Sequence, residues 1–180
     1  MAHVHTESPS RLLADHIALI KSATPGRTAL DVACGKGRNA LFLAREGFDV
    51  TGLELSDDAI AATRHAADAE GLSVTVEKTD LEAGDATLPL ITYDLVTVFY
   101  YLHRPLLEAI RGAVKPGGFI VYETFLIDQH ERWGSPRRAE FALGHNELLD
   151  TFAGFRIHHY REVVDEDNQS AFAQIVAQRA

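Results

Sequence analysis

The sequence predicts an α/β fold in which helices cover both faces of a doubly wound, seven-stranded, mostly parallel sheet whose last strand is antiparallel. Three observations indicate this class. Short apolar runs alternate with segments of helical period between residues 28 and 125, glycine-containing turns follow several runs, and only a short acidic turn separates the last two. Since 46% of the 180 residues are apolar, one core can form, and we expect a single domain over residues 1–180.

The elements before residue 126 follow from periodicity and turn signals. Apolar residues recur at helical spacing from Leu12 to Ile20, behind the capping residue Ser10, so we expect an N-terminal helix region over 1–24. Beyond it we expect strands over 28–32, 48–55, 73–78, 93–99 and 119–125, with helices over 39–46, from Ser56 to about residue 70, and over 105–114. This alternation is typical of parallel strands joined by right-handed crossovers.

The rhythm changes after residue 125. Residues 126–144 show no clear periodicity, and because they follow a strand end they could fold over the neighbouring crevice as a lid. A helix is predicted over 146–152. Strands are predicted over 156–164 and 171–178, and the acidic turn 165–168 between them is short enough for an antiparallel hairpin.

Composition and charge exclude several classes of partner. The net charge is −9, which repels a phosphate backbone, so nucleic acid is a disfavoured partner and a small-molecule substrate is favoured. No apolar run reaches the length of a membrane span. Cys34 is the only cysteine, and the first nine residues lack the apolar core of a signal peptide. We therefore expect a cytoplasmic protein without membrane contacts.

The clearest motif joins the first strand to its helix in the run Leu30-Asp31-Val32-Ala33-Cys34-Gly35-Lys36-Gly37-Arg38-Asn39-Ala40. Gly35 and Gly37 permit a tight turn and close approach of a ligand to backbone N–H groups at a helix N-terminus. The same spacing fits the dinucleotide fingerprint, so a nicotinamide-dependent oxidoreductase is an alternative. Asp31 argues against it, because a carboxylate at the strand end favours a cationic ligand over a pyrophosphate.

This motif resembles D-x-[GA]-x-G-x-G of the Rossmann-like S-adenosylmethionine-dependent methyltransferases, and the likeness extends from about residue 28 to 125. The resemblance implies that Asp31 lies near the cofactor's amino group and that Glu54 accepts hydrogen bonds from both ribose hydroxyls. It also implies that Asp80 and Leu81 hold adenine. The residues assigned to the cofactor are Asp31, Ala33, Gly35, Gly37, Asn39, Glu54, Leu55, Asp80, Leu81 and Phe99. S-adenosylmethionine carries a sulfonium and an ammonium and no phosphate, so acidic strand ends suit it.

The residues after the fourth strand should line the crevice where methyl donor and acceptor meet. Tyr100 is a candidate for substrate contact, and Tyr101 and His103 are candidates to position or deprotonate an acceptor. The alternative is that these residues are aromatic core and a helix cap. A base is not required for every acceptor, because holding a nucleophile in line with an activated methyl group can supply about 7–11 kcal/mol.

Two further features bear on the acceptor. The run from Gly35 to Ala44, followed by Gly47-Phe48-Asp49-Val50, resembles the tellurite-resistance and thiopurine methyltransferase branch, which implies a small, soft nucleophile such as a thiol or an oxyanion. In the segment 126–144, Arg132, Arg137 and Arg138 would favour an anionic acceptor if the segment closes over the crevice. The alternative is a solvated surface loop.

Other readings are weaker. Cys34 has no obvious histidine partner and is interpreted as a small loop residue. The histidines lack the spacing of a zinc site, so no metal is expected. The function predicted is methyl transfer from S-adenosylmethionine to a small molecule, with S-adenosylhomocysteine as product. A non-catalytic module that binds the cofactor remains the alternative from another class.

Overall fold

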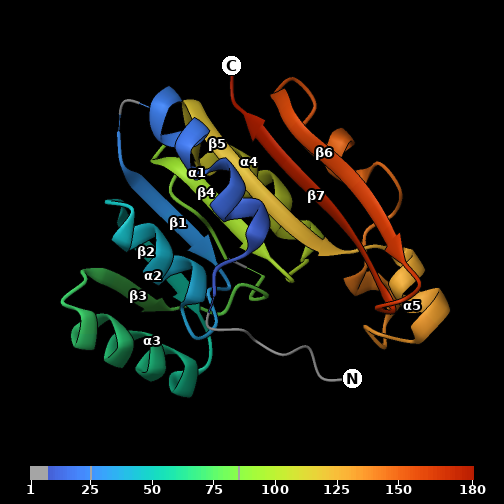
Figure 1. Ribbon diagram of the computed structural model, residues 1–180, viewed down its shortest axis with the longest axis horizontal. Coiled ribbons are helices and arrows are strands. Elements are labelled where there is room, and N and C mark those ends of the chain that lie inside the picture. The colour runs from blue at the N-terminus through green and yellow to red at the C-terminus, as the bar shows by residue number, and fades with distance from the viewer. Residues whose placement is uncertain (1–7, 25, 85) are drawn as a thin grey trace.

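The computed structural model describes residues 8–24, 26–84 and 86–180, which form a seven-stranded sheet in the order β3-β2-β1-β4-β5-β7-β6 (Figure 1). The strands are β1 (Thr28–Val32), β2 (Asp49–Glu54), β3 (Val74–Lys78), β4 (Tyr93–Phe99), β5 (Val114–Phe125), β6 (Arg156–Asp165) and β7 (Ser170–Gln178). All neighbouring pairs are parallel except those of β7, which runs antiparallel to both β5 and β6. The predicted fold class is confirmed.

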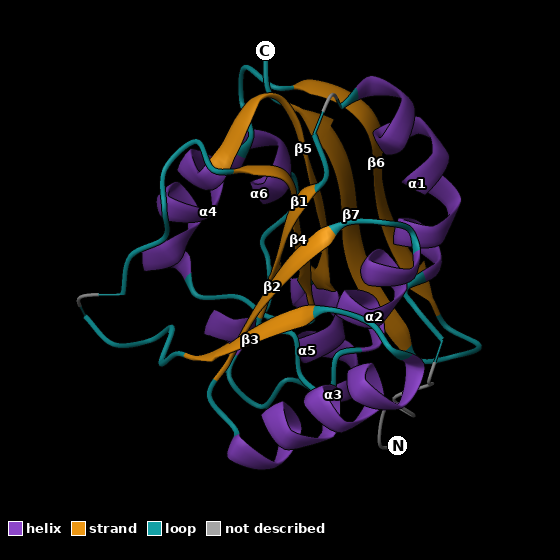
Figure 2. Ribbon diagram, turned by 90° about the vertical axis from the view of Figure 1, so that its left-hand side faces the viewer, coloured by secondary structure: helices purple, strands orange, loops and turns teal. Residues whose placement is uncertain are grey.

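Helices cover both faces of this sheet. Helices α1, α2 and α3 lie on one side, and α4 and α6 lie on the other (Figure 2). The helices are α1 (Arg11–Ala23), α2 (Arg38–Arg45), α3 (Asp57–Glu70), α4 (Leu107–Ala113), α5 (Ile127–Trp133) and α6 (Glu147–Thr151), with short 3-10 turns at Arg104–Leu106 and Ala139–Phe141. Residues 1–7 of the predicted N-terminal region lie outside the described residues.

The central strands are apolar on both faces because each face packs against helices. In β4 every residue is buried. Val96 and Val98 belong to the core on the α4 and α6 side, whereas Leu95 and Phe99 pack with α1 and α2 on the other side. This two-sided burial explains why most residues of β4 are apolar, which is typical of a parallel sheet covered on both faces.

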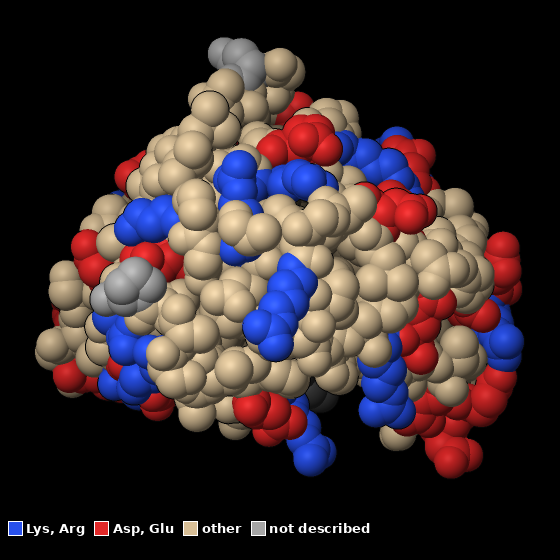
Figure 3. All heavy atoms as spheres, turned by 90° about the horizontal axis from the view of Figure 1, so that it is seen from above, with Lys and Arg blue, Asp and Glu red and all other residues tan. Residues whose placement is uncertain are grey.

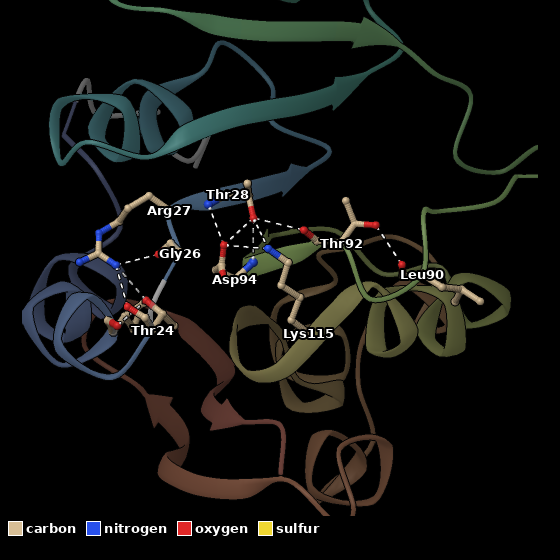
Figure 4. A network of polar contacts seen from close by, with 9 residues as sticks. Thr24, Gly26, Arg27, Thr28, Leu90, Thr92, Asp94 and Lys115 are labelled. Carbon is tan, nitrogen blue, oxygen red and sulfur yellow. Dashed lines mark hydrogen bonds and ion pairs between the residues drawn. The ribbon is translucent and has the colours of Figure 1, made fainter.

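A polar network stabilises the amino ends of β1 and β4 (Figure 4). The Asp94 carboxylate accepts hydrogen bonds from the Thr28 backbone N–H (3.0 Å) and hydroxyl (2.6 Å) and from the Lys115 ammonium (3.1 Å). Burial alone would raise the pKa of Asp94, but these donors and the Lys115 charge hold it below its usual value. A buried carboxylate therefore joins β1, β4 and the start of β5.

The segment after β5 contains a helix, α5, that the sequence pattern did not indicate. This helix is held by a polar side chain rather than by an apolar stripe. Gln129 is only 3% exposed, and its amide accepts a hydrogen bond from the Ala171 backbone N–H (2.5 Å) and donates one to the Gln169 carbonyl (3.2 Å). Periodicity of apolar residues does not detect a helix fastened in this way.

The predicted boundary between the helix over 105–114 and the strand over 119–125 is also displaced. Strand β5 already begins at Val114. Gly117, at φ +77°, donates to the Arg179 carbonyl (2.8 Å), and the Arg179 N–H donates to the Gly118 carbonyl (2.9 Å). The turn signal Lys115-Pro116-Gly117-Gly118 is thus absorbed into an irregular strand start, because the chain end after β7 pairs with it.

The outer surface carries charges of both signs. On the face shown in Figure 3, basic and acidic side chains are interspersed among uncharged ones. This face offers no continuous basic band of the kind that binds a phosphate backbone. Within the part of the chain that the structure describes, no helix has both the length and the apolar character required to cross a bilayer.

Candidate active site

Two adjoining cavities lie at the carboxyl ends of β1, β2 and β4. The larger has a volume of about 660 Å³ and is lined by residues of the glycine loop, by Glu54 and by Phe99 and Tyr100. The smaller, of about 340 Å³, includes Leu55, Asp80, Leu81 and Tyr101 in its lining. Ala33 and Glu54 line both cavities. The strand order reverses between β1 and β4, which is where doubly wound sheets bind ligands.

Asp31 is the most unusual group in the larger cavity. Its side chain is 2% exposed, and Oδ1 accepts a hydrogen bond from the Thr97 hydroxyl (2.8 Å). Oδ2 is buried and accepts no hydrogen bond from the described residues. Burial raises the pKa of Asp31 to about 7, against the opposing effects of the Thr97 hydrogen bond, the Arg38 cation and the Ala40 backbone. The cavity therefore contains an acceptor atom that the protein itself leaves unused.

The glycine loop packs against α3. Gly35 and Gly37 both have positive φ, at +57° and +79°, and a Cβ on Gly37 would lie 2.4 Å from Thr63 Cγ2. The Thr63 hydroxyl in turn donates to the Gly35 carbonyl (3.1 Å). Gly37 lines neither cavity itself, and its predicted contact with the cofactor stays a prediction.

Cys34 belongs to this loop and is buried. Burial raises the pKa of its thiol far above the usual value, and the Asp31 and Glu54 carboxylates raise it further. A Cβ on Gly52 would lie 2.7 Å from Cys34 Sγ, so the sulfur fills the space above β2. A thiol that resists ionisation and packs in this way is suited to a structural role.

Glu54 connects the two cavities. Its Oε2 accepts from the Gly35 N–H (3.0 Å), and its Oε1 accepts from the backbone N–H groups of Leu55 and Ser56 (2.9 Å each). Three backbone donors fix the carboxylate between the glycine loop and the start of α3. Oε1 thus has two donors already, whereas Oε2 keeps a lone pair for a ligand hydroxyl.

The smaller cavity combines apolar and acidic groups. Leu81 is 6% exposed, whereas Leu55 is 53% exposed. Asp80 Oδ1 accepts from the Glu82 N–H (3.0 Å). Tyr101 also lines this cavity, with a buried hydroxyl that has no partner among the described residues, and burial raises its pKa to about 12. Tyr101 therefore lines the same cavity as Asp80 and Leu81, whereas Tyr100 lines the larger one.

Tyr100 lines the larger cavity in a strained conformation. Its φ is +55°, the residue is 42% exposed, and its backbone N–H donates to the Glu123 carbonyl (2.8 Å). Burial raises the pKa of its phenol, and so do the charge of the Glu123 carboxylate and a side-chain hydrogen bond with it. The Arg38 guanidinium lies over the ring, 5.9 Å from its centroid. Positive φ in a residue with a bulky side chain is typical of functional sites.

The remaining predicted residues have structural surroundings of their own. Asn39 lines the larger cavity, but its Oδ1 accepts from the Ser10 N–H (2.8 Å) and so ties the start of α1 to the glycine loop. His103 precedes the 3-10 turn and lines neither cavity. Its catalytic role and that of Tyr101 stay predictions.

The segment 126–144 contributes no residue to the lining of the two cavities. Arg132 pairs with Asp128 (3.4 Å) and with Glu166 of the β6–β7 turn. Arg138 pairs with Glu140, and Arg137 is exposed. The lid and its contacts with substrate stay predictions.

Sequence reasoning did not select several residues that the structure brings to the site. Thr97 and Thr63 position Asp31 and the glycine loop, and Lys36 and Arg38 line the larger cavity. The polar threonines lie inside an apolar strand and on a buried helix face, so their spacing carries no signal. Within residues 8–24, 26–84 and 86–180, no three His, Cys, Asp or Glu side chains are placed to hold a metal ion.

Comparison with curated proteins finds relatives in ubiquinone biosynthesis. An enzyme from Pectobacterium carotovorum named ubiquinone biosynthesis O-methyltransferase is 34% identical over 126 residues, which are 67% of this chain and 52% of that protein. The protein of the same name from Photorhabdus laumondii is 33% identical over a similar span. The chain spans about half the length of these curated relatives.

Solved structures show the same fold. TehB from Haemophilus influenzae superposes with a TM-score of 0.74 at 21% identity, over 93% of this chain and 62% of that one. An S-adenosylmethionine-dependent methyltransferase from Mesorhizobium loti superposes with a TM-score of 0.71 at 20% identity, over 94% and 99% of the two chains.

A family model described as a methyltransferase domain matches residues 29–118, half of the chain. The match begins in β1 and includes the glycine loop, the ends of β2 and β4 and every described residue that lines the two cavities. The chain therefore belongs to the methyltransferase domain family, as the resemblance of its glycine loop predicted, and its cofactor is S-adenosylmethionine.

Proposed function

We propose that the protein transfers the methyl group of S-adenosylmethionine to a small-molecule acceptor that presents a soft or anionic nucleophile, a thiol or an oxyanion. The observation that carries the proposal is Asp31, whose buried Oδ2 has no donor among the described residues. A cationic ligand group would supply that donor, and a pyrophosphate would be repelled. We place this activity in the cytoplasm.

The residues present fit the cofactor. Asp31 would accept from its ammonium group, and Glu54, held by three backbone donors, would accept from a ribose hydroxyl at Oε2. In the smaller cavity, Leu55 and Leu81 would pack against adenine while Asp80 accepts from its amino group. Phe99 would pack against the chain of the methionine moiety in the larger cavity.

When bound, S-adenosylmethionine supplies a methyl group activated by a sulfonium, so the protein's main task is orientation. Asp31 and Glu54 would hold the ligand with their carboxylates, and Phe99, which is 8% exposed, would exclude water beside it. No histidine lines either cavity among the described residues. A thiolate or an oxyanion needs no strong base, which favours acceptors of this class.

A hydroxyl acceptor is the second candidate, and the pair Tyr100 and Glu123 favours it. The curated relatives are named O-methyltransferases, and a hydroxyl must lose its proton as its oxygen takes the methyl group. The Glu123 side chain, on a residue only 6% exposed, forms a hydrogen bond with the Tyr100 phenol. The acceptor's proton could pass to the Tyr100 oxygen while the Tyr100 proton passes to the Glu123 carboxylate.

The test begins with calorimetric titration of the protein with S-adenosylhomocysteine, with NAD and NADP as controls. Micromolar, near-stoichiometric binding of S-adenosylhomocysteine alone is expected. The protein is then incubated with S-adenosylmethionine and separate panels of small thiols, soft oxyanions and phenols, and methylated product is measured by mass spectrometry.

The two candidates predict different results for one variant. Tyr100→Phe keeps the ring under Arg38 but removes the phenolic proton relay. Methylation of a thiol or an oxyanion should survive this change, whereas methylation of a phenol should fall by about 100-fold or more. Binding of NAD in place of S-adenosylhomocysteine would refute both candidates. Binding of S-adenosylhomocysteine without any methylated product would favour a non-catalytic module.

A further inference from the structure

The two residues that follow β4 contribute to different cavities. Tyr100 lines the larger cavity and Tyr101 lines the smaller one. Tyr100 has a φ of +55°, which is unfavourable for a residue with a bulky side chain because its Cβ crowds the backbone. Contacts with the rest of the protein must therefore hold this pair of residues in place.

Two neighbouring residues of β5 supply such contacts. The Glu123 carbonyl accepts from the Tyr100 backbone N–H (2.8 Å), and the Tyr122 hydroxyl donates to the Tyr101 carbonyl (2.8 Å). The first hydrogen bond precedes the left-handed residue and the second follows it. Together they fix the Tyr100–Tyr101 unit at both of its ends.

Tyr122 is placed to hold the chain and not to touch a ligand. It is completely buried, its ring contacts Phe152 edge-on at 6.4 Å, and it lines neither cavity. Burial raises the pKa of its phenol, and so do the neighbouring Tyr101 and Glu147, so the hydroxyl keeps its proton and remains a donor. A phenylalanine would pack in the same space, so the hydrogen bond to Tyr101 is what the hydroxyl adds.

We propose that Tyr122 is a positioning residue for the cofactor, because its hydroxyl keeps Tyr100 in the left-handed conformation and thereby holds Tyr100 and Tyr101 in their separate cavities. The inference rests on the proposed function, since the ligand of the two cavities is the cofactor of that reaction. Without the hydroxyl, the turn after β4 would relax toward an ordinary backbone conformation, and both tyrosine side chains would shift within the binding site.

The first test removes the hydroxyl alone. Tyr122→Phe should bind S-adenosylhomocysteine about 3- to 10-fold more weakly in calorimetry, the range expected for one hydrogen bond. The matched control is Tyr93→Phe. Tyr93 lies at the amino end of β4, is 9% exposed, forms a side-chain hydrogen bond with Thr51 and lines neither cavity. The control should lose stability in thermal unfolding but keep the wild-type affinity.

The second test asks whether the hydroxyl acts through the left-handed residue. Tyr122→Phe is combined with Tyr100→Asn and, separately, with Tyr100→Phe. Asparagine adopts the left-handed conformation readily, whereas phenylalanine resists it as tyrosine does. Removing the hydroxyl should therefore weaken binding by less than about 2-fold in the asparagine background and by the same factor as in the wild type in the phenylalanine background. A residue that only packs the core would show no such coupling.

Each result bears on the proposal. Unchanged affinity in Tyr122→Phe, or an equal loss in both Tyr100 backgrounds, overturns it while binding of S-adenosylhomocysteine by the wild type leaves the proposed function standing. Failure of the wild-type protein to bind this ligand overturns both. If Tyr122→Phe is too unstable to titrate, the melting temperatures of the two double variants replace the affinities. The loss of melting temperature caused by Tyr122→Phe should then be smaller in the Tyr100→Asn background, and equal losses overturn the proposal.

Discussion

At the scale of single residues, Asp31 combines a stability cost with a binding function. The folded protein keeps a proton on this carboxyl up to about pH 7, whereas the unfolded chain releases it near pH 3.8. A raised folded pKa means that the free energy of unfolding contributed by Asp31 falls as pH rises through this window. Above pH 7 the charged carboxylate costs about 4 kcal/mol, at about 1.4 kcal/mol per pH unit.

We predict that Asp31→Asn raises the free energy of unfolding of the ligand-free protein by about 1–3 kcal/mol at pH 8. The gain is smaller than the full cost of the charged carboxylate. The asparagine amide group takes the place of the oxygen that had no donor, and its N–H groups then have no acceptor. Urea unfolding at pH 8 and pH 5 measures the effect, and the gain should shrink at pH 5. A variant less stable than the wild type at pH 8 would show that the charged Asp31 carboxylate does not lower the free energy of unfolding.

We also predict that S-adenosylhomocysteine binds the wild-type protein more weakly below pH 7, by up to tenfold per pH unit, because the ammonium group requires ionised Asp31. In Asp31→Asn the affinity should be lower at pH 8, and its dependence on pH should be flat between pH 5 and 7. Calorimetric titrations across this range provide the measurement. A steep pH dependence that persists in the variant would assign the titration to another group.

Among individual residues, the sequence predicted those that occupy strand ends. Asp31 and Glu54 lie at the carboxyl ends of β1 and β2, Asp80 follows β3, and all three line the cavities. The sequence could not predict which of two adjacent tyrosines adjoins which cavity. Tyr100 adopts a positive φ, and that local twist directs Tyr101 into the smaller cavity. Its physical cause is tertiary, since the Tyr100 N–H bonds to the Glu123 carbonyl on the neighbouring strand.

At the scale of elements, the join between β1 and α2 depends on one glycine. We predict that Gly37→Ala destabilises the protein by about 2–4 kcal/mol and weakens S-adenosylhomocysteine binding, because a Cβ would combine a left-handed conformation with a clash against Thr63. Thermal unfolding and calorimetry provide the two measurements.

The matched control for this prediction is Gly47→Ala at the end of α2. Gly47 has φ +88°, but a Cβ there would meet nothing within 4 Å. The control should therefore lose only about 1 kcal/mol, the cost of the backbone conformation alone, and should bind S-adenosylhomocysteine like the wild type. Equal losses in both variants would mean that the packing of the loop on α3 contributes little.

Most elements could be predicted because their apolar spacing matched their final burial. Helix α1 buries Leu12, Leu13, Ile17 and Ile20 as its periodicity indicated. Helix α5 escaped prediction because it buries the polar residue Gln129. The irregular start of β5 also escaped, because its pairing with Arg179 joins residues more than sixty positions apart. Local patterns thus predict elements that pack by apolar faces and miss those held by distant polar contacts.

At the scale of the whole molecule, the amino ends of the strands contribute to stability, whereas their carboxyl ends form the ligand cavities. Asp94, Thr28 and Lys115 form their network at the amino ends of β1 and β4, whereas the cavities open at the carboxyl ends. We predict that Asp94→Asn lowers the free energy of unfolding by about 2–3 kcal/mol at pH 7 while S-adenosylhomocysteine affinity stays unchanged.

The pH dependence provides a check on this prediction. Since the folded pKa of Asp94 is lowered, its contribution to stability is present above about pH 4 and is lost as pH falls through the folded pKa. The difference between wild type and Asp94→Asn should therefore shrink in acid. Lys115→Met should cost less than Asp94→Asn at pH 7, because Thr28 still donates to the carboxylate. A change in ligand affinity would contradict the separation of the two ends.

The junction of the two cavities at Ala33 and Glu54 has a consequence for how affinity arises. Each cavity should accept one fragment of the ligand, so adenosine and homocysteine should bind together without competing, which two-ligand titration would show. Joining the fragments makes the second binding event intramolecular, and the linked molecule gains an effective concentration on the order of millimolar or higher. Competition between the fragments would mean that the cavities are one site. If the fragments do not compete, much of the ligand's affinity arises because a covalent bond joins its two halves.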